Sequence, residues 1–424
     1  MEMRCIPSRL SGRINAISSK SDAHRLLICA ALSDKPTKIN CNCLSKDIVA
    51  TAECLKSMGA DITVGNGAIT VAPQPFNKKA TLNCIESGST LRFLLPVVSA
   101  LGIDATFKGQ GRLPERPISP LKEEMEKKGV TFHTGSEFPL HLTGVLQSGE
   151  YEIAGNISSQ FITGLLFALP LLEGDSKIKL IPPVESRSYL NITISALKKF
   201  GIEIIEEENL YIIKGKQQYK SPNEITVDGD WSNGAFFLCA GALSKEGITV
   251  SGLDVNSPQG DKKILEILRR MGADITIEGT DITVKKNRLF GTIVDAGDIP
   301  DLVPIVSVVA ACCEKGVTHI INAERLRIKE SDRIQSVFNM LDTVGAAVRQ
   351  TDDGLFIWSD NQLICRVVNG YNDHRIVMSA AILSGECSLP VDITDYKAVE
   401  KSYPHFFNDF NSLGGNANVI NDGK

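Results

Sequence analysis

Positively charged side chains recur where the sequence predicts that helices begin. They are Lys20, Arg25, Arg92, Lys329, Arg333 and Arg375. The amino-terminal end of a helix carries partial positive charge and normally attracts acidic residues, so each cation is locally unfavourable. Lys329 and Arg333 also stand four residues apart, a like-charge spacing that costs roughly a few tenths of a kcal/mol on a helix. A ligand with several negative charges would reverse each penalty, because backbone N–H groups and Arg side chains bind phosphate and carboxylate oxygens.

Further site candidates lie near these cations in the sequence. Asp301 stands directly before an apolar stretch, Glu330 lies beside Lys329, and His374, a candidate ligand, lies beside Arg375. Structural roles are the alternative: a helix cap for Asp301, a first-turn acid for Glu330, a core position for His374 and solvated surface charge for any one cation. Repetition of the cations at equivalent positions favours a site.

A proline-rich loop, GQGRLPERPISPL at residues 109–121, adds Arg112 and Arg116. It reads equally as a rigid turn, and its Gly-x-Gly lacks the third glycine of a dinucleotide-binding fingerprint. The sequence contains no zinc or calcium ligand spacing, no P-loop and no nucleophile elbow. We therefore expect no metal site.

The elements that must position these residues recur along the chain. The stretch 264–284, ILEILRRMGADITIEGTDITV, reads as a helix, a glycine stop and a β-hairpin. Similar stretches occur at residues 55–71, 125–142, 197–213 and 341–357, with a truncated copy at 410–420. Their glycines are Gly59, Gly129, Gly201, Gly272, Gly345 and Gly414, 69 to 73 residues apart. The chain therefore contains six repeats with a period of about 70 residues.

Each repeat also contains a stretch with helical character that is apolar on nearly every side. These stretches are residues 26–32, 93–101, 161–172, 235–243, 302–313 and 376–383. A helix of this kind must be buried on nearly every side. Polar clusters precede them at residues 20–22, 87–90, 158–160, 230–233, 298–301 and 372–375. If the repeats are equivalent, the amino ends of the six buried helices are equivalent too.

The two ends of the chain complement each other. Residues 2–6 read as a strand without a partner in the first repeat, and the last repeat ends at residues 418–420 without a return strand. We expect residues 1–14 to belong to the carboxyl-terminal domain. The amino-terminal three-repeat domain then covers residues 15–228, and the carboxyl-terminal one covers residues 229–424, with a hinge at residues 228–230. One open array of six repeats is the alternative.

Composition indicates an ordinary globular protein: 424 residues, 43% hydrophobic and 22% charged, with a formal net charge of −5. The negative charge argues against a nucleic-acid-binding surface. The longest apolar runs are shorter than the roughly 18 residues of a membrane span, and the start MEMRCIPSRL has no signal-peptide core. Eleven cysteines without a CxxC pair favour a reduced, cytoplasmic protein.

Seven motifs span nearly the whole chain. They are KSDAHR at 20–25, ESGSTLRF at 86–93, LPERPI at 113–118, SSQFITGLL at 158–166, RIKESDRI at 327–334, YNDHRIVMS at 371–379 and EKSYPHFF at 400–407. In this order they resemble the 5-enolpyruvylshikimate-3-phosphate synthase family. The resemblance implies an α/β fold of two similar domains, each of three βαβαββ units around buried parallel helices, an inside-out α/β barrel whose helix amino ends face an interdomain cleft.

The resemblance also implies an activity. The family transfers the enolpyruvyl (1-carboxyvinyl) group of phosphoenolpyruvate to the 5-hydroxyl of shikimate 3-phosphate and releases phosphate, without metal or cofactor. This reaction belongs to the shikimate pathway, which leads to chorismate and aromatic amino acids. We expect a monomer whose domains rest open, because facing cationic half-sites repel, and close when shikimate 3-phosphate binds.

The same resemblance assigns residues to the two anionic substrates. Shikimate 3-phosphate is expected at Lys20, Ser21, Arg25, Ser158, Ser159, Gln160, Ser186, Tyr189, Asp301 and Lys329. Phosphoenolpyruvate is expected at Lys20, the backbone of Gly88, Arg116, Gln160, Arg333, Arg375 and Lys401. Asp301 is the expected base for the hydroxyl, while Glu330 and Lys20 share proton transfer at the methylene carbon.

Two positions depart from the family pattern. Glu86-Ser87-Gly88-Ser89 replaces a frequent Asn-Ala-Gly-Thr, so phosphoenolpyruvate contacts and inhibitor sensitivity can differ there. Arg325 stands where an Asn is frequent, four residues before Lys329. One substrate contact can therefore differ as well.

Two other functions are alternatives. An enolpyruvyl transferase acting on UDP-N-acetylglucosamine has the same architecture, but that family uses a Cys on the loop corresponding to residues 109–118, and this chain has no Cys between Cys84 and Cys239. A non-catalytic repeat protein that binds phosphorylated ligands would keep the cations but has no use for Asp301 and Glu330.

Overall fold

The computed structural model of the chain describes residues 2–359, 362–364 and 367–420 and divides into two compact units. Unit 1 comprises Met1–Ser19 and Asp228–Lys424, and unit 2 comprises Lys20–Val227. The sequence placed the first boundary after residue 14 instead. The difference arises because β2 (Gly12–Asn15) pairs in parallel with β15 (Ile248–Ser251), and the backbone N–H of Ser19 donates to the carbonyl of Asp228 at 2.8 Å.

Unit 2 contains three repeats. The first comprises α1 (Lys20–Ala31), β3 (Thr37–Asn40), α2 (Lys46–Met58), β4 (Asp61–Gly65), β5 (Ala68–Ala72) and, from the end of the unit, β14 (Glu224–Thr226). The second comprises β6 (Lys79–Asn83), α3 (Gly88–Ala100), β7 (Asp104–Lys108), α4 (Leu121–Lys127), β8 (Val130–Phe132) and β9 (Leu140–Gly144). The third comprises β10 (Glu150–Ala154), α5 (Ser159–Ala168), β11 (Ser176–Ile181), α6 (Arg187–Lys199), β12 (Ile204–Glu207) and β13 (Leu210–Ile213).

Unit 1 also contains three repeats. The first comprises β2, α7 (Trp231–Leu243), β15, α8 (Ile264–Met271), β16 (Asp274–Glu278) and β17 (Asp281–Lys285). The second comprises β18 (Ile293–Asp295), α9 (Val303–Ala311), β19 (Val317–Ile321), α10 (Arg333–Thr343), β20 (Val348–Gln350) and β21 (Leu355–Trp358). The third comprises β22 (Val367–Val368), α11 (His374–Leu383), β23 (Val391–Ile393), α12 (Phe406–Ser412), β24 (Asn416–Ile420) and β1 (Glu2–Ile6).

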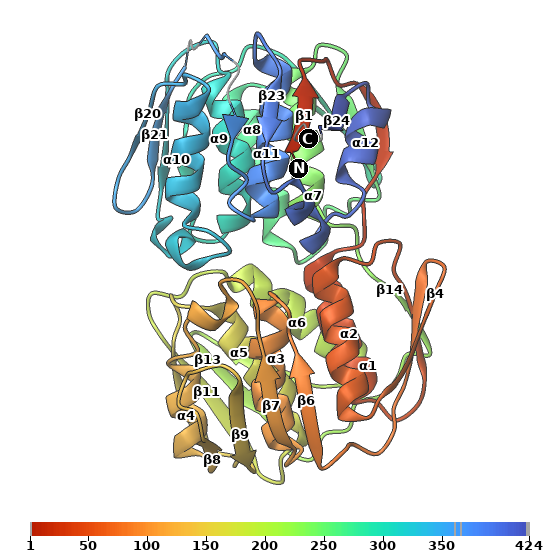
Figure 1. Cartoon of the computed structure of the whole chain (residues 1–424). Coiled ribbons are helices and arrows are strands. Elements are labelled where there is room, and N and C mark those ends of the chain that lie inside the picture. Colours follow the sequence, from red (N-terminus) through yellow and green to blue (C-terminus); the bar gives the residue numbers. More distant parts are fainter. Residues whose placement is uncertain (1, 360–361, 365–366, 421–424) are drawn as a thin grey trace. The chain divides into compact units, whose positions relative to one another are not determined.

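All six sheets share one topology. In each, the first strand pairs in parallel with the second, and the two remaining pairings are antiparallel, as in the order β10-β11-β13-β12. The amino-terminal strand β1 takes the position of the missing return strand of the last repeat, between β23 and β24. Figure 1 shows β1, in red, beside the blue β24. The predicted α/β fold of three βαβαββ repeats in each unit is confirmed.

Burial separates the helices of each repeat into two kinds. Every residue of α9 and α11 is buried, whereas α8 buries only the stripe of Ile264, Leu265, Ile267, Leu268 and Met271. The all-apolar helices therefore form the interior, where α7, α9 and α11 pack on one another in unit 1. The amphipathic helices cover them.

The predicted glycine stops all have the left-handed backbone that favours glycine. Their φ angles are 123° at Gly59, 89° at Gly129, 75° at Gly201, 101° at Gly272, 87° at Gly345 and 96° at Gly414. At Gly272 the backbone N–H also donates back to the carbonyls of the last turn of α8. Five of these residues turn an amphipathic helix into the hairpin that follows it, and Gly414 turns α12 into β24. Over the described residues, the structure has no helix that is both long and apolar enough to span a bilayer.

Candidate active-site groups

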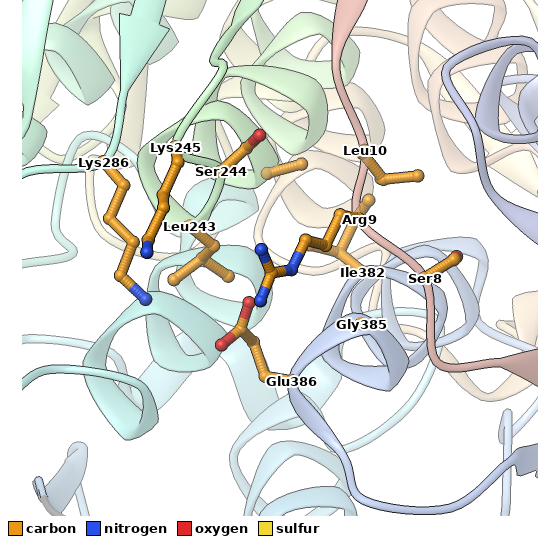
Figure 2. A pocket seen from close by; sticks show the side chains of 11 residues that line it. Ser8, Arg9, Leu10, Leu243, Ser244, Lys245, Lys286, Ile382, Gly385 and Glu386 are labelled. Carbon is orange, nitrogen blue, oxygen red and sulfur yellow. The ribbon is translucent and has the colours of Figure 1, made fainter.

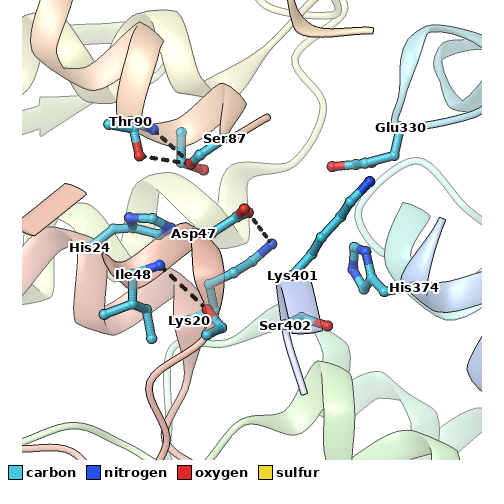
Figure 3. Close-up of polar contacts among 12 residues, drawn as sticks. Lys20, His24, Asp47, Ile48, Ser87, Thr90, Glu330, His374, Lys401 and Ser402 are labelled. Atoms are coloured by element: carbon cyan, nitrogen blue, oxygen red, sulfur yellow. Dashed lines mark hydrogen bonds and ion pairs between the residues drawn. The ribbon is translucent and has the colours of Figure 1, made fainter. Parts of the chain in front are cut away.

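Lys20 is the first residue of α1 in unit 2, and an acid already neutralises it. Its Nζ lies 3.0 Å from Oδ2 of Asp47, with both side chains largely buried (15% and 13% exposed). Asp47 lies in the first turn of α2, a helix capped by Ser45, where the helix dipole favours a carboxylate. Figure 3 shows this pair. A substrate anion at Lys20 must compete with Asp47.

A buried chain of hydrogen bonds fixes the amino-terminal regions of α1, α2 and α3. His24 Nδ1 lies 2.7 Å from Thr51 Oγ1, which lies 2.7 Å from Thr90 Oγ1. Thr90 in turn donates from both its backbone and its hydroxyl to Ser87 Oγ, the cap of α3 (Figure 3). Burial, with the nearby positive charges of Lys20 and Arg25, holds the pKa of His24 well below its usual range, so the ring is neutral.

Arg25 ties α1 to α6. Its Nε donates to Thr193 Oγ1 at 2.8 Å, while its Nη1 and Nη2 donate to the carbonyls of Ser21 and Tyr189 at 2.5 and 3.0 Å. Burial lowers the pKa of Arg25 to about 10, which still leaves the guanidinium charged at neutral pH. Ser186, which caps α6, has a left-handed backbone with φ of 55° and is buried. Arg25 thus holds Ser21 and Tyr189, two predicted substrate residues, in fixed positions.

Helices α3 and α5 bring Arg92 and Gln160 together. Arg92 Nη1 donates to Gln160 Oε1 at 2.7 Å, and Gln160 Nε2 donates to Ser89 Oγ at 2.9 Å. The two helices approach closely at Gly164, where an added Cβ would lie 2.4 Å from the carbonyl oxygen of Arg92. Ser158 caps α5 by accepting from the N–H of Gln160 at 3.3 Å, and Ser159 is buried in the first turn.

Gly88 faces two guanidinium groups. A Cβ at this residue would lie 2.8 Å from Nη1 of Arg92 and 2.9 Å from Nη1 of Arg116, so only glycine leaves room for them. Both Arg side chains are buried, at 3% and 9% exposure. Two cations beside the first backbone N–H groups of α3 form a strongly anion-binding arrangement.

In unit 1, Arg333 is the centre of a carboxylate cluster. Its Nη1 lies 2.7 Å from Asp301 Oδ1, its Nη2 lies 2.8 Å from Glu330 Oε2, and its Nε lies 2.8 Å from Asp373 Oδ2. Lys329 precedes α10 rather than lying in its first turn, so the like-charge helix spacing predicted from sequence is absent here. Arg333 thus has acids, not a helical neighbour, as its partners.

Asp301 binds two guanidinium groups. It lies in the 3₁₀-helix η4 (Pro300–Leu302) directly before α9. Its Oδ2 accepts from Arg375 Nη2 at 2.8 Å, and its carbonyl accepts from Nη1 at 3.3 Å. Burial opposes ionisation of Asp301, but the positive charges of Arg375, Arg333 and Lys329 outweigh it and hold its pKa well below the usual range. Asp301 is therefore an ionised carboxylate held between two guanidinium groups, and the N-cap positions of η4 and α9 belong to Ile299 and Leu302.

Lys329 follows the 3₁₀-helix η5 (Glu324–Ile328), which carries Arg325. Burial, followed by the neighbouring positive charge of Arg325, lowers the pKa of Lys329 to about 7, although Asp301 and Glu330 act in the opposite direction. Arg325 itself donates from Nη2 to the carbonyl of Gly297. The unusual Arg thus ties η5 to the loop before Asp301 and makes Lys329 easier to deprotonate.

Lys401 lies at the end of the 3₁₀-helix η7 (Tyr396–Lys401), where its Nζ donates to the carbonyl of Asn372 at 2.5 Å. Its side chain extends in the direction of Glu330 in Figure 3. Asp373, the next residue after Asn372, caps α11 and also accepts from Ser331 Oγ at 3.0 Å. Lys401 is therefore held against the same cap that binds Arg333.

Asp261 is a buried acid that sequence analysis missed. It lies in the 3₁₀-helix η3 (Gly260–Lys263), is 5% exposed, and its Oδ1 has no hydrogen-bond partner among the described residues. Burial and the negative charge of Asp301 raise its pKa to about 7, against the effect of Arg375. Two neighbouring carboxyl groups with separated pKa values are typical of acid–base sites.

Most of the described cysteine thiols are buried, which disfavours the reactive thiolate form. The ten described cysteines are free, and Cys365 lies outside the described residues. Burial raises the pKa of Cys84 well above its usual value, so it is not a thiolate at neutral pH. Within the described ranges, no three His, Cys, Asp or Glu side chains are arranged to hold a metal ion.

Comparison with known proteins identifies the family. The family model for EPSP synthase (3-phosphoshikimate 1-carboxyvinyltransferase) matches residues 5–410. This chain belongs to the EPSP synthase family. A 3-phosphoshikimate 1-carboxyvinyltransferase of Clostridium kluyveri is 43% identical over 99% of this chain and 98% of its own length, and one of Clostridioides difficile is 42% identical over 100% and 99%.

Solved structures agree on the fold. An EPSP synthase from Acinetobacter baumannii superimposes with a TM-score of 0.83 at 24% identity, covering 99% of this chain and all of that one. The enolpyruvyl transferase NikO from Streptomyces tendae gives 0.77 at 17% identity, with 98% of each chain covered. The predicted EPSP synthase resemblance and enolpyruvyl transferase fold are confirmed.

The structure brings predicted residues of this EPSP synthase family member together inside each unit. Unit 1 brings together Asp301, Glu330, Arg333 and Arg375, and unit 2 joins Ser21 with Arg25 and Tyr189, and Gly88 with Arg116. Sequence analysis missed Asp47, Asp261 and Asp373 as partners. A signal existed for two of them: Asp47 follows the cap Ser45, and Asp373 lies inside the YNDHR motif.

Proposed function

We propose that the protein transfers the 1-carboxyvinyl group of phosphoenolpyruvate to the 5-hydroxyl of shikimate 3-phosphate and releases phosphate. Membership of the EPSP synthase family over residues 5–410 carries this conclusion. The contacts of Arg333 support it, because one guanidinium holds Asp301 and Glu330 at 2.7 and 2.8 Å and so presents two carboxylates side by side. A repeat protein that only binds anions gains nothing from that arrangement.

In this proposal, phosphoenolpyruvate binds to Arg333, Arg375 and Lys401 of unit 1 and to Lys20, Gln160, Arg116 and the backbone of Gly88 of unit 2. Arg333 and Arg375 are already occupied by Asp301 in the free protein. An incoming phosphate or carboxylate shares these cations with Asp301. The charge that holds the pKa of Asp301 low is then partly offset, so substrate binding makes Asp301 a better base.

The chemistry is an addition followed by an elimination. Asp301 accepts the proton of the 5-hydroxyl while the hydroxyl oxygen forms a bond to C2 of phosphoenolpyruvate. Glu330 with Lys20 supplies a proton to the methylene carbon C3. In the second step the bond from C2 to the phosphate oxygen breaks, and C3 returns its proton to the same groups. Carboxylates near C2 stabilise positive charge that develops there.

Shikimate 3-phosphate binds, in this proposal, to Lys20, Ser21, Arg25, Ser158, Ser159, Gln160, Ser186 and Tyr189, together with Asp301 and Lys329. The departure at residues 86–89 bears on the phosphoenolpyruvate contacts instead. There the Ser87 hydroxyl is fully buried as the cap of α3, and Ser89 Oγ accepts from Gln160 Nε2 at 2.9 Å. Glu86 packs against Gly111, where an added Cβ would lie 2.7 Å from its Oε2.

We further propose that the protein is a cytoplasmic monomer that closes around shikimate 3-phosphate and uses neither metal nor cofactor. Trp231 is a natural probe for closure, since it is fully buried and its indole N–H donates to the carbonyl of Asp254 at 2.9 Å. Its fluorescence and the small-angle scattering radius should both change on saturation with shikimate 3-phosphate. No change in either would contradict closure.

A phosphate-release assay tests the main proposal. Phosphoenolpyruvate is supplied with shikimate 3-phosphate in one arm and with UDP-N-acetylglucosamine in the other. Release only with shikimate 3-phosphate is the expected result, and Asp301→Asn is the matched inactive control. Release only with UDP-N-acetylglucosamine would assign the sister activity, and release with neither acceptor would favour a binding protein.

A further inference from the structure

Unit 1 contains a cavity at the carboxyl-terminal ends of its interior helices. Its volume is about 200 Å³, and its lining comes from the β1–β2 loop, the ends of α7 and α11, the residue after β17, and the 3₁₀-helix η6 (Ser384–Glu386). Arg375 lies at the opposite end of α11, a helix of 10 residues and therefore about 15 Å long. The cavity is thus separate from the cluster around Asp301.

Three cations face this cavity. Figure 2 shows the amines of Lys245 and Lys286 side by side and the guanidinium of Arg9 across from them. Across the part of the chain that the structure describes, none of these three side chains has an ion pair or hydrogen bond of its own. Arg9 and Lys245 are exposed and Lys286 is half-buried, so solvent screens part of their mutual repulsion, and a bound anion would remove the rest.

The fourth ionisable group is Glu386, whose carboxylate faces Arg9 in Figure 2. Burial raises the pKa of Glu386, while the charges of Lys286 and Arg9 only partly oppose this. One carboxyl group therefore cannot neutralise three cations. The hollow keeps an excess of two positive charges even when Glu386 is ionised.

We propose that Arg9, Lys245 and Lys286 form a second anion-binding site, distinct from the substrate groups, for a small dianion bearing a phosphate group. Three cationic donors match the oxygens of a tetrahedral phosphate. At roughly 30 Å³ per water, the cavity has the volume of about six or seven water molecules, enough for phosphate or a small phosphate monoester.

The alternative is a purely structural role for the cations. Helix carboxyl ends carry partial negative charge, and Lys or Arg side chains stabilise them without any ligand. That role explains Lys245 after α7, but it does not explain why Arg9 and Lys286, from two other segments of the chain, face the same cavity. The two interpretations differ in whether phosphate binds here.

Hydrogen exchange of the whole chain, read by mass spectrometry, tests the proposal. The probes are millimolar inorganic phosphate and glycerol 3-phosphate, each compared with chloride at equal ionic strength. We expect slower exchange at residues 8–11, 244–247 and 384–387. Lys245→Gln and Lys286→Gln should each raise the phosphate concentration needed for this protection about tenfold, as the loss of one charged hydrogen bond predicts. Lys285→Gln, an exposed neighbour outside the cavity, is the matched control and should behave like the parent chain.

The outcomes separate this site from the proposed catalytic one. Protection confined to residues near Gly88, Gln160, Asp301 and Arg333 would overturn the second site and leave the proposed function untouched. Protection at residues 8–11, 244–247 and 384–387 that persists unchanged in both Lys245→Gln and Lys286→Gln would also overturn the second site. If glycerol 3-phosphate protects at lower concentration than phosphate, the site takes phosphate monoesters, and the reverse order assigns it to free phosphate.

Discussion

Arg333 and Asp373 form an ion pair that is sealed from solvent, with Nε 2.8 Å from Oδ2 and side chains 1% and 0% exposed. The same Asp373 caps α11 by accepting from the N–H of Arg375 at 2.9 Å. One carboxylate therefore fixes the first residues of both α10 and α11. The position of the candidate substrate cations depends on this pair.

Asp373→Asn should destabilise the protein strongly. Asn can still cap the helix, but it leaves Arg333 with one fewer anionic partner in the interior, and breaking such a pair costs about 3–5 kcal/mol. Urea unfolding of the free protein measures the loss. Asp332→Asn is the matched control, since Asp332 caps α10 and pairs with Arg327 at partly exposed positions (37% and 32%), where about 1 kcal/mol or less is expected.

Asp301→Ala should lower kcat by about 10² to 10⁴, the usual effect of losing a general base. The KM for phosphoenolpyruvate should hold or fall, because the variant releases Arg333 and Arg375 from their internal partner.

Arg375→Ala should instead raise the KM for phosphoenolpyruvate strongly. Arg333→Ala is a poorer test of binding than sequence alone suggests, since it also strands Asp373 in the interior. Steady-state kinetics with each substrate varied decide the matter, and near-normal kcat in Asp301→Ala would move the base to Glu330 or Lys20.

Affinity for shikimate 3-phosphate should weaken as the pH rises above about 7. The pKa of Lys329 is about 7 in the free protein, and a bound dianion raises it, so the contribution of Lys329 is complete below that pH and is lost above it. Lys329→Arg keeps its charge and should remove this part of the decline. Calorimetric titrations from about pH 6 to about pH 9, with variant and parent compared at each pH, cancel the titration of the ligand itself. If the affinities of the parent chain and of Lys329→Arg fall in parallel as the pH rises, Lys329 stays charged over this pH range.

Asp261→Asn should stabilise the free protein at neutral pH but not in acid. The pKa of Asp261 is raised from 3.8 to about 7 on folding, so the folded state binds more protons between these values and its stability falls as the pH rises through them. The variant lacks this loss. Its advantage in the free energy of unfolding should grow from near zero at about pH 4 to roughly a few kcal/mol at about pH 8. A difference independent of pH would mean that Asp261 does not titrate in this range.

Gly88→Ala should raise the KM for phosphoenolpyruvate about tenfold or more while the fold is retained. The new methyl group must displace the flexible ends of Arg92 and Arg116, and small displacements in a site cost much of its binding energy. Gly65→Ala, in the β4–β5 hairpin where a Cβ meets only one atom at 3.8 Å, is the control. Unchanged kinetics in Gly88→Ala would show that neither guanidinium needs its present position.

Local patterns in the sequence predicted the architecture well. The six glycine stops and the six apolar helices depend on spacing along the chain, and both recur in the structure. The partners of Arg333 were beyond this reasoning, because Asp301 and Asp373 lie 32 and 40 residues away and are joined only by the packing of α9, α10 and α11. Sequence analysis therefore found the cations but treated them as awaiting a ligand, whereas carboxylates already neutralise several of them.

The exchange of β2 and β14 escaped prediction for a similar reason. Each strand directly precedes an interior helix of its own stretch of chain but pairs elsewhere, β2 with β15 and β14 with β3. β2 has four residues and β14 has three, and the sequence of so short a strand does not specify which of two equivalent sheets it joins. Tertiary packing makes that choice.

The pairing of β1 with β24 sets the order in which the nascent chain gains its structure. Translation at about 5–20 residues per second makes residues 20–227 available about 10–40 s before residue 420 is reached. Unit 2 therefore has time to fold while the ribosome is still at work, whereas β1, the first strand made, waits for the last. A chain that terminates before residue 416 would leave β1 paired with β23 on one side only, with its other edge open, a state prone to aggregation and exposed to quality-control proteases.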